Sequence, residues 1–150
     1  MFHRAERIEY KEGTTLEVTF QDGLVKSYDI KRLFKKYPQM EILTDRNLFT
    51  SGKLTGAYGI IWNDELDLEA ETIYQEGKTV RREKVSLAKK VGCEIAAARS
   101  RLGMTQLDLA KATGIDQSDL SKLEKGALNP SLNTLERIGK ALGVEISIKF

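Results

Sequence analysis

The spacing of apolar residues along the chain changes near residue 78. Before that point, short runs alternate between apolar and polar residues, as over residues 15–20, and this is the period of a half-buried β-strand. The pair Asp22-Gly23 follows and is typical of a hairpin turn, because glycine accepts a positive φ. Residues 24–30 have the composition of the returning strand. The sequence therefore predicts a β-hairpin near the start of the chain.

Weaker patterns complete this first part. Residues 33–37 predict a short helix that ends at Pro38, because proline lacks the N–H that a helix needs beyond its first turn. Residues 58–62 are a further strand candidate, and residues 69–75 predict a last short helix. We therefore expect residues 1–77 to form a small α+β domain.

Beyond residue 87 the apolar period becomes 3.6, as in amphipathic helices. Gly92 lies inside the first helical stretch and weakens it by about 1 kcal/mol relative to alanine. We expect this helix to begin late or to bend there, and to end at Gly103. Strict alternation over residues 144–150 predicts a final strand. Between them, three shorter helices are predicted over residues 105–113, 117–125 and 131–142.

Residues 78–87 separate the two parts and are predicted to form a basic linker. Their cations are Lys78, Arg81, Arg82 and Lys84. A solvated hinge and an arm that enters the minor groove of DNA use the same residue types, so charge alone does not choose between them. The fold class is thus α+β, with the small domain over residues 1–77, this linker, and an all-α domain with a short C-terminal strand over residues 88–150.

The net charge of +2 conceals a difference between the two parts. Residues 1–77 hold 10 Lys and Arg against 14 Asp and Glu, a net charge of −4. Residues 78–150 hold 14 Lys and Arg against 8 Asp and Glu, a net charge of +6. A basic part beside an acidic one suggests that the second part meets a polyanion.

Several chemistries are disfavoured by composition. One cysteine, Cys93, and one histidine, His3, supply neither an intrachain disulfide nor a structural zinc set. A nucleophile–histidine pair would have to rest on His3, beside a terminus where chains often fray. The carboxylates Asp64, Glu65, Asp67, Glu69 and Glu71 do not follow the spacing of a calcium loop. We therefore expect no enzyme activity, no metal and no cofactor.

Membrane and export signals are also missing from the pattern. The first 25 residues hold no apolar block like a signal peptide, and no run approaches the roughly 18 apolar residues that span a bilayer. The expected location is the cytoplasm, with no membrane partner.

The segment TQLDLAKATGIDQSDLSKLEKG, which begins at Thr105, concentrates several constraints. Thr105 and Asp116 are suited to cap two short helices, and Gly114 suits the turn between them. Leu120 and Leu123 supply the inward face of the second helix. The side chains that this leaves outward are able to hydrogen-bond to base edges: Gln117, Ser118, Ser121 and Lys122.

These residues resemble the lambda-repressor-like helix-turn-helix family, also called the XRE family. The resemblance covers about residues 88–143 and rests on TQ-x-x-L-A-x-x-x-G and on the later S-x-L-E-x-G-x-x-x-P-S-L-x-T-L-x-x-I-x-x-A-L-G. Thr113 departs from the pattern, because the family usually has an apolar residue there. The resemblance implies a module that binds duplex DNA.

The resemblance also implies a role for each matching residue. The implied base contacts are Gln117, Ser118, Ser121 and Lys122. The implied phosphate contacts are Gln106, Asn129, Ser131 and Asn133. Arg99 and Glu124 occupy the positions of a partly buried structural ion pair. Asp119 lies on the same helix and repels phosphate; it either accepts from cytosine or rejects wrong sites.

Modules of this kind act as twofold dimers on half-sites about 34 Å apart, so a palindromic operator and a homodimer are expected. The terminal strand is the candidate dimer surface through one apolar face, formed by Val144, Ile146, Ile148 and Phe150. The same alternation also suits a strand that covers the domain's own core, and the sequence leaves both open.

Residues 5–76 resemble a small bacterial α+β domain family of unknown function. The matching features are Asp22-Gly23, Leu33-Phe34, Asn47-Leu48-Phe49, Ile61-Trp62, Asp67-Leu68 and Ile73-Tyr74. The leading hypothesis is a sequence-specific DNA-binding repressor, in a sharper version the antitoxin of a toxin–antitoxin operon whose acidic first domain binds a basic toxin. The alternative is a protein-interaction adaptor whose helical domain does not bind DNA.

Overall fold

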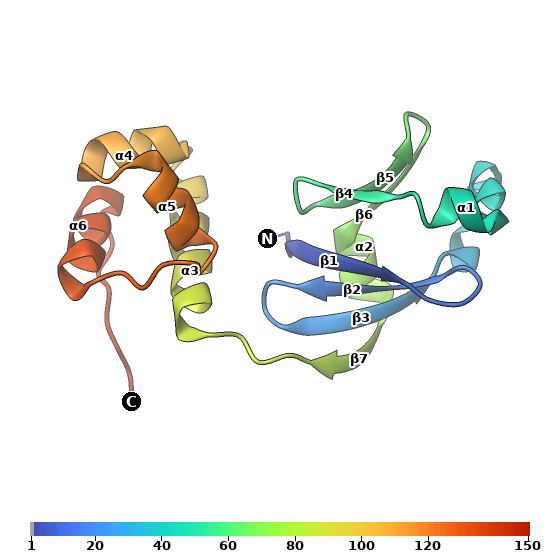
Figure 1. Ribbon diagram of the computed structural model, residues 1–150, viewed down its shortest axis with the longest axis horizontal. Helices are drawn as coiled ribbons and strands as arrows, with labels where there is room; N and C mark the ends of the chain where they lie inside the picture. The colour runs from blue at the N-terminus through green and yellow to red at the C-terminus, as the bar shows by residue number, and fades with distance from the viewer. Residues whose placement is uncertain (1) are drawn as a thin grey trace. The chain divides into compact units, whose positions relative to one another are not determined.

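The computed structural model describes residues 2–150 and divides the chain into two units (Figure 1). The first unit ends at Lys84 and the second runs from Val85 to Phe150. The first is built mainly from β-strands and the second from helices, which confirms the α+β class. No helix among residues 2–150 is long and apolar enough to cross a membrane.

Two antiparallel sheets form the first unit. The four-stranded sheet has the order β1-β2-β3-β7, with β1 Ala5–Tyr10, β2 Thr15–Phe20, β3 Leu24–Asp29 and β7 Lys78–Arg82. The three-stranded sheet has the order β4-β5-β6, with β4 Lys53–Thr55, β5 Gly59–Asn63 and β6 Leu66–Glu69. The predicted hairpin is confirmed as β2 and β3, which pair Leu16 with Tyr28, and Gly23 has the expected positive φ of 91°.

Short helices connect these strands. They are the 3₁₀ helices η1 (Ile30–Leu33) and η2 (Pro38–Thr44) and the α-helices α1 (Arg46–Phe49) and α2 (Ala70–Glu76). The prediction that Pro38 ends a helix was wrong, because Pro38 begins η2. A proline fits the first turn of a helix, where its missing N–H has no intrahelical acceptor.

One apolar core joins both sheets and α2. It includes Phe20 and Tyr28 from the first sheet, Ile60 from the second, and Ile73 from α2, all less than 2% exposed. The indole of Trp62 is 9% exposed and donates to the carbonyl oxygen of Phe49 at 2.7 Å. The aromatic residues of this unit therefore hold its two sheets together.

The predicted linker over residues 78–87 needs correction. Its first five residues, Lys78–Arg82, form β7 and pair with β3, in the register Val25 with Arg81 and Ser27 with Lys78. Arg81 also contacts Glu17 through a 3.1 Å ion pair. This segment is an edge strand of the first sheet, because β3 offers it a free ladder of backbone groups that sequence spacing does not reveal.

Moving the boundary also changes the charge of the two units. Residues 85–150 hold 10 Lys and Arg against 7 Asp and Glu, a net charge of +3. Residues 1–84 hold 14 Lys and Arg against 15 Asp and Glu, a net charge of −1. The contrast of −4 and +6 therefore depended on assigning the cations of β7 to the second part.

Four helices build the second unit: α3 Leu87–Arg101, α4 Gln106–Thr113, α5 Gln117–Glu124 and α6 Leu132–Leu142. Their aliphatic core includes Ile95, Leu109, Leu120 and Ile138, each at most 4% exposed. Gly103 and Gly143 follow α3 and α6 with positive φ values of 66° and 65°. The helices predicted for this part are thus confirmed, but the expectation of a late start at Gly92 was wrong, because α3 begins at Leu87 and continues through Gly92.

The predicted C-terminal strand is not formed in the single chain. Residues 144–150 carry no regular secondary structure. The amide of Val144 donates to the carbonyl oxygen of Gly139 at 3.0 Å, and a Cβ on Gly139 would lie 3.4 Å from the side chain of Ile146. Ile148 is 67% exposed. A strand needs backbone partners on a neighbouring strand, and this segment has none within residues 2–150.

Candidate nucleic-acid interface

The turn between α4 and α5 is set by two local features. Thr105 and Asp108 form a capping box: the Thr105 hydroxyl accepts from the Asp108 amide at 3.1 Å, and the Asp108 carboxylate accepts from the Thr105 amide at 2.9 Å. That second bond lowers the pKa of Asp108. Gly114 ends α4 with a φ of 73°, a conformation that costs little only for glycine. The chain therefore reverses between the two helices as the sequence predicts.

Asp116 behaves differently from the expected cap. It occupies the N-cap position of α5, but its side chain accepts no hydrogen bond from the first turn. The predicted capping bond was wrong. The carboxylate still lies beside the positive end of the helix dipole, which is a weaker and less directional interaction than a hydrogen bond.

The two faces of α5 differ sharply. Leu120 is fully buried and Leu123 is 4% exposed, so they anchor the helix against the core. Gln117, Ser118 and Lys122 are exposed, and Ser121 is half-buried. The predicted base-contacting side chains thus share the accessible side of one helix.

The end of α5 lies unusually close to α3. A Cβ on Gly92 would lie 2.3 Å from the carbonyl oxygen of Leu123, so no side chain fits there. A Cβ on Gly126 would lie 2.6 Å from the Cα of Lys89, and Gly126 has a φ of 76°. Gly92, which the sequence marks as a weak point of its helix, therefore lies where α3 and the end of α5 approach too closely for any side chain.

Arg99 and Glu124 form the ion pair that the resemblance implies. The Arg99 Nε and Nη2 atoms donate to the two carboxylate oxygens of Glu124 at 2.7 and 3.0 Å. Their side chains are 14% and 5% exposed. Arg99 Nη1 also donates to the carbonyl oxygen of Met104 at 2.8 Å. The pair thereby ties α3 to both the end of α5 and the loop before α4.

Gln106 joins this network, which sequence reasoning missed. Its Nε2 atom donates to Glu124 Oε2 at 2.9 Å. A side-chain amide nitrogen carries two hydrogens, so one remains for another acceptor. The phosphate contact of Gln106 stays a prediction, and the buried carboxylate already orients its side-chain amide. The signal that could have revealed this contact is the carboxylate itself, which has more acceptor sites than Arg99 fills.

The predicted phosphate contacts on the other side surround the start of α6. Asn129, Ser131 and Asn133 are all exposed. Ser131 is also the N-cap, because its hydroxyl oxygen accepts from the Thr134 amide at 3.1 Å. These residues therefore lie at the N-terminal end of α6, where the helix dipole favours an anion.

The departure at Thr113 is accommodated locally. Thr113 is 6% exposed, and its hydroxyl donates to the carbonyl oxygen of Leu109 at 2.7 Å. Its own carbonyl accepts from Arg137 Nη1 at 3.3 Å. A buried hydroxyl with a partner costs little, so the helix pair keeps its packing.

The carboxylates between residues 64 and 71 do not come together as a set of metal ligands. Among residues 2–150, no group of three or more candidate ligands could hold an ion. Glu71 accepts from the backbone and ring nitrogens of His3, at 2.8 and 3.1 Å. The backbone bond, helped by the bonds from Gln75 and the His3 ring, lowers the pKa of Glu71 to about 2.

Comparisons with known proteins agree with the two units. Residues 95–149 match the family described as "Helix-turn-helix", and residues 5–79 match the "Protein of unknown function (DUF2442)" family. The chain is 38% identical over 60 residues to an uncharacterized HTH-type transcriptional regulator, y4dJ, of Sinorhizobium fredii, which covers 40% of this chain and 78% of that protein.

Two further similarities are more limited. The chain is 40% identical over 57 residues to the immunity repressor protein of Bacillus phage phi105, covering 38% of this chain and only 40% of that repressor. The crystal structure of the clp gene regulator ClgR from C. glutamicum is 27% identical, with a TM-score of 0.43 and coverage of 44% of this chain and 85% of that one.

The fold, the geometry of the α4–α5 turn and the family matches all indicate a helix-turn-helix domain. The turn at Gly114 and the two-faced helix α5 lie within the matched residues 95–149. The chain belongs to the helix-turn-helix family of DNA-binding transcriptional regulators, and its first unit belongs to the DUF2442 family.

Proposed function

We propose that the protein is a transcriptional repressor that reads its operator by placing α5 in the major groove. The observation that carries this proposal is the division of α5, whose leucines are buried while Gln117, Ser118 and Lys122 remain exposed. Amide, hydroxyl and ammonium groups are the side-chain groups that pair with base edges in that groove. The name of the phage repressor, to which part of this chain is similar, supports repression over activation.

Phosphate contacts flank this helix on two sides in the proposal. Gln106 supplies one from the start of α4, and Asn129, Ser131 and Asn133 supply the others near the start of α6. Phosphate contacts fix orientation on the duplex without reading sequence. The location that this function requires is the cytoplasm, where the operator is.

The repressor acts as a homodimer on a palindromic operator in this proposal. Val144, Ile146, Ile148 and Phe150 are all at least 43% exposed, so an apolar face of the C-terminal segment is available to a second copy. Pairing two such segments would form the strand that the single chain lacks. Deleting residues 144–150 should then abolish dimerisation in analytical ultracentrifugation and weaken operator binding.

The test is a binding measurement on operator DNA selected from random duplexes. Gln117→Ala and Lys122→Ala should each weaken specific binding by about 1–3 kcal/mol, while Lys53→Ala in the first unit should not. Affinity should also fall steeply as salt rises, because phosphate contacts release counterions. The proposal would be contradicted if no DNA sequence were enriched from the random duplexes, or if both α5 variants kept their affinity. Either result would favour the protein-interaction adaptor.

The antitoxin role and the absence of enzyme activity remain proposals. The absence of enzyme activity is supported by composition, since the sequence offers one histidine and no nucleophile–base motif. Co-expression with the product of the neighbouring gene distinguishes a partnered antitoxin, which co-purifies in a fixed ratio, from a repressor that acts alone.

A further inference from the structure

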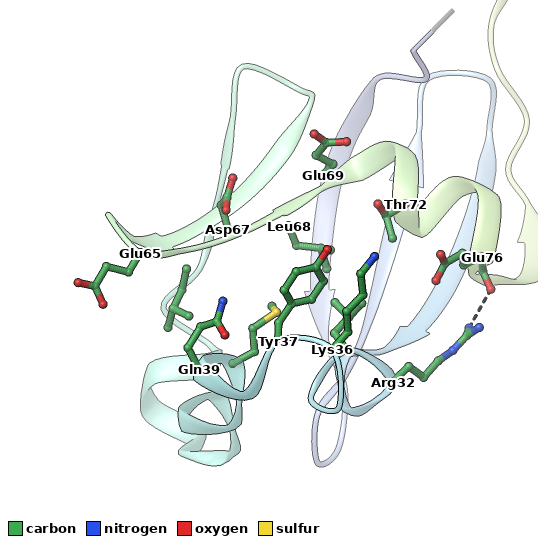
Figure 2. A pocket seen from close by; sticks show the side chains of 13 residues that line it. Arg32, Lys36, Tyr37, Gln39, Glu65, Asp67, Leu68, Glu69, Thr72 and Glu76 are labelled. Atoms are coloured by element: carbon green, nitrogen blue, oxygen red, sulfur yellow. Dashed lines mark hydrogen bonds between the residues drawn. The ribbon is translucent and has the colours of Figure 1, made fainter.

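A groove in the first unit has an unpaired strand edge as one wall. It encloses about 560 Å³ and runs between β6 and the segment that joins η1 to η2 (Figure 2). All four residues of β6, Leu66–Glu69, line it. Among residues 2–150 the strand pairs only with β5, so the backbone groups on its other side face the groove. An edge of this kind is a template for another extended chain.

The two faces of β6 present different chemistry to such a chain. Leu66 and Leu68 are about 5% exposed and face the core, whereas Asp67 and Glu69 are exposed on the opposite face. Tyr37 rises from the other wall towards the strand (Figure 2) and is 39% exposed. The largely buried Met40 also lines the groove. An added strand would therefore place alternate side chains over apolar residues and beside carboxylates.

The carboxylates along this edge form no ion pair with any of residues 2–150. Within residues 2–150, Glu65, Asp67 and Glu69 take part in no ion pair. Two cations lie on the opposite wall: Arg32 donates to the carbonyl oxygen of Glu76 at 3.0 Å, and the Lys36 ammonium lies 5.2 Å from the centroid of the Tyr37 ring. The groove lining therefore holds four carboxylates, Glu65, Asp67, Glu69 and Glu76, against two cations and is net negative.

We propose that β6 binds an extended segment of a partner protein in which basic and apolar residues alternate. The segment adds to the three-stranded sheet through backbone hydrogen bonds. Its Lys or Arg side chains lie beside Asp67 and Glu69, and its apolar side chains cover Tyr37 and Met40. Opposite charges directly across neighbouring strands are favourable, and like charges are not.

The chain's own C-terminal segment fits this groove poorly. One face of residues 144–150 carries Glu145, Ser147 and Lys149, so its charges cancel. Added to β6, this face would bring Glu145 as well as Lys149 beside Asp67 and Glu69, so repulsion by one offsets attraction by the other. Charge complementarity therefore selects a basic partner rather than a second copy of this chain. This inference does not rest on the DNA-binding proposal, because the groove lies wholly within the first unit.

Peptide display on the full chain tests the inference. Random 12-residue peptides selected on the folded protein should be enriched in alternating Lys or Arg and apolar residues. The strongest one, synthesised, should lose at least tenfold in affinity on the charge-reversed variant Asp67→Lys/Glu69→Lys. The variant Glu12→Lys/Glu94→Lys changes the net charge equally at exposed sites outside the groove and should bind as well as the unmodified chain.

Hydrogen exchange locates the binding. Peptide binding should slow amide exchange in β6, and fluorescence of Trp62 on the adjacent β5 verifies that the charge-reversed variant is folded. Enrichment of no peptide, of acidic peptides or of peptides like residues 144–150 would overturn the inference. So would affinity unchanged by the charge reversal; the carboxylates would then only protect the edge from aggregation. Specific DNA binding should be equal in all these variants.

Discussion

The cores of the two units are stabilised by different kinds of side chain. All aromatic residues except Phe150 lie before residue 85, and fully buried rings such as Phe20, Tyr28 and Phe49 join the two sheets of the first unit. The second unit has an aliphatic core, a buried ion pair and two glycines at its closest helix contact. The first unit therefore relies on buried aromatic side chains, whereas the second also relies on an ion pair and close glycine contacts behind its polar helix α5.

This difference gives each unit its own reporter. Trp62 is the only tryptophan and lies in the first unit, so its fluorescence follows that unit alone. Circular dichroism at 222 nm is dominated by the helices of the second unit. Because the two cores are separate, we expect two transitions that mutations shift independently.

The largest effect is expected from Glu124→Ala. Removing this carboxylate takes the only acidic group in this ion pair away from the largely buried Arg99 guanidinium and also removes the acceptor of Gln106. The second unit should lose about 3–5 kcal/mol of unfolding free energy, while the Trp62 transition stays in place. Urea titration, followed by Trp62 fluorescence and by circular dichroism at 222 nm, measures the unfolding free energy of each unit.

The control replaces both charges by apolar residues. Arg99→Met/Glu124→Leu should recover much of the loss, because no charge is then buried alone. A loss in the single variant below about 1 kcal/mol would show that the ion pair contributes little to the second unit.

Gly92→Ala should also destabilise the second unit, by about 1–3 kcal/mol, through overpacking against α5. Helix propensity alone predicts that the same substitution raises the unfolding free energy by about 1 kcal/mol. The sign of the measured change therefore shows whether helix propensity or packing against α5 dominates at this position. Ser100→Ala, at an exposed site on α3, is the matched control and should change stability by less than about 0.5 kcal/mol. The midpoints of thermal unfolding of the unmodified chain, the Gly92→Ala variant and the Ser100→Ala variant measure these changes.

The two N-caps of the helix-turn-helix pair should differ by a smaller amount. Thr105→Ala removes a hydroxyl that accepts from the Asp108 amide and should cost about 1 kcal/mol. Asp116→Ala removes no capping bond and should cost less, which equilibrium denaturation can resolve. Equal losses would mean that Asp116 forms its bond in solution.

The smallest effect is expected at the surface of the first unit. The pKa of Glu71 is lowered from an ordinary 4.5 to about 2, chiefly by the amide of His3. Its contribution to stability is therefore complete above about pH 4.5 and is lost as the pH falls towards 2. Glu71→Gln should flatten this part of the pH profile of the Trp62 transition, and Glu65→Gln, a carboxylate without an ion pair, should leave it unchanged.

Much of the site was predictable because its signals are local. Gly114 needs a positive φ, Thr105 caps the helix that follows it, and the spacing of Leu120 and Leu123 fixes which side of α5 is buried. Each depends on residues within one or two helical turns. The capping failure at Asp116 shows the limit, because an N-cap position does not fix the rotamer of its side chain.

The amino-acid sequence by itself determined the hairpin, the four helices and the polar face of α5, since periodicity and turn chemistry act over a few residues. Only the tertiary structure decided that Lys78–Arg82 is a strand rather than a linker, that Gly92 permits a close helix contact, and that Gln106 binds Glu124. The physical reason is the same in each case. A backbone ladder, a steric contact and a shared carboxylate all join residues far apart in the chain. The spacing of residues within one segment does not show which distant residues that segment will contact.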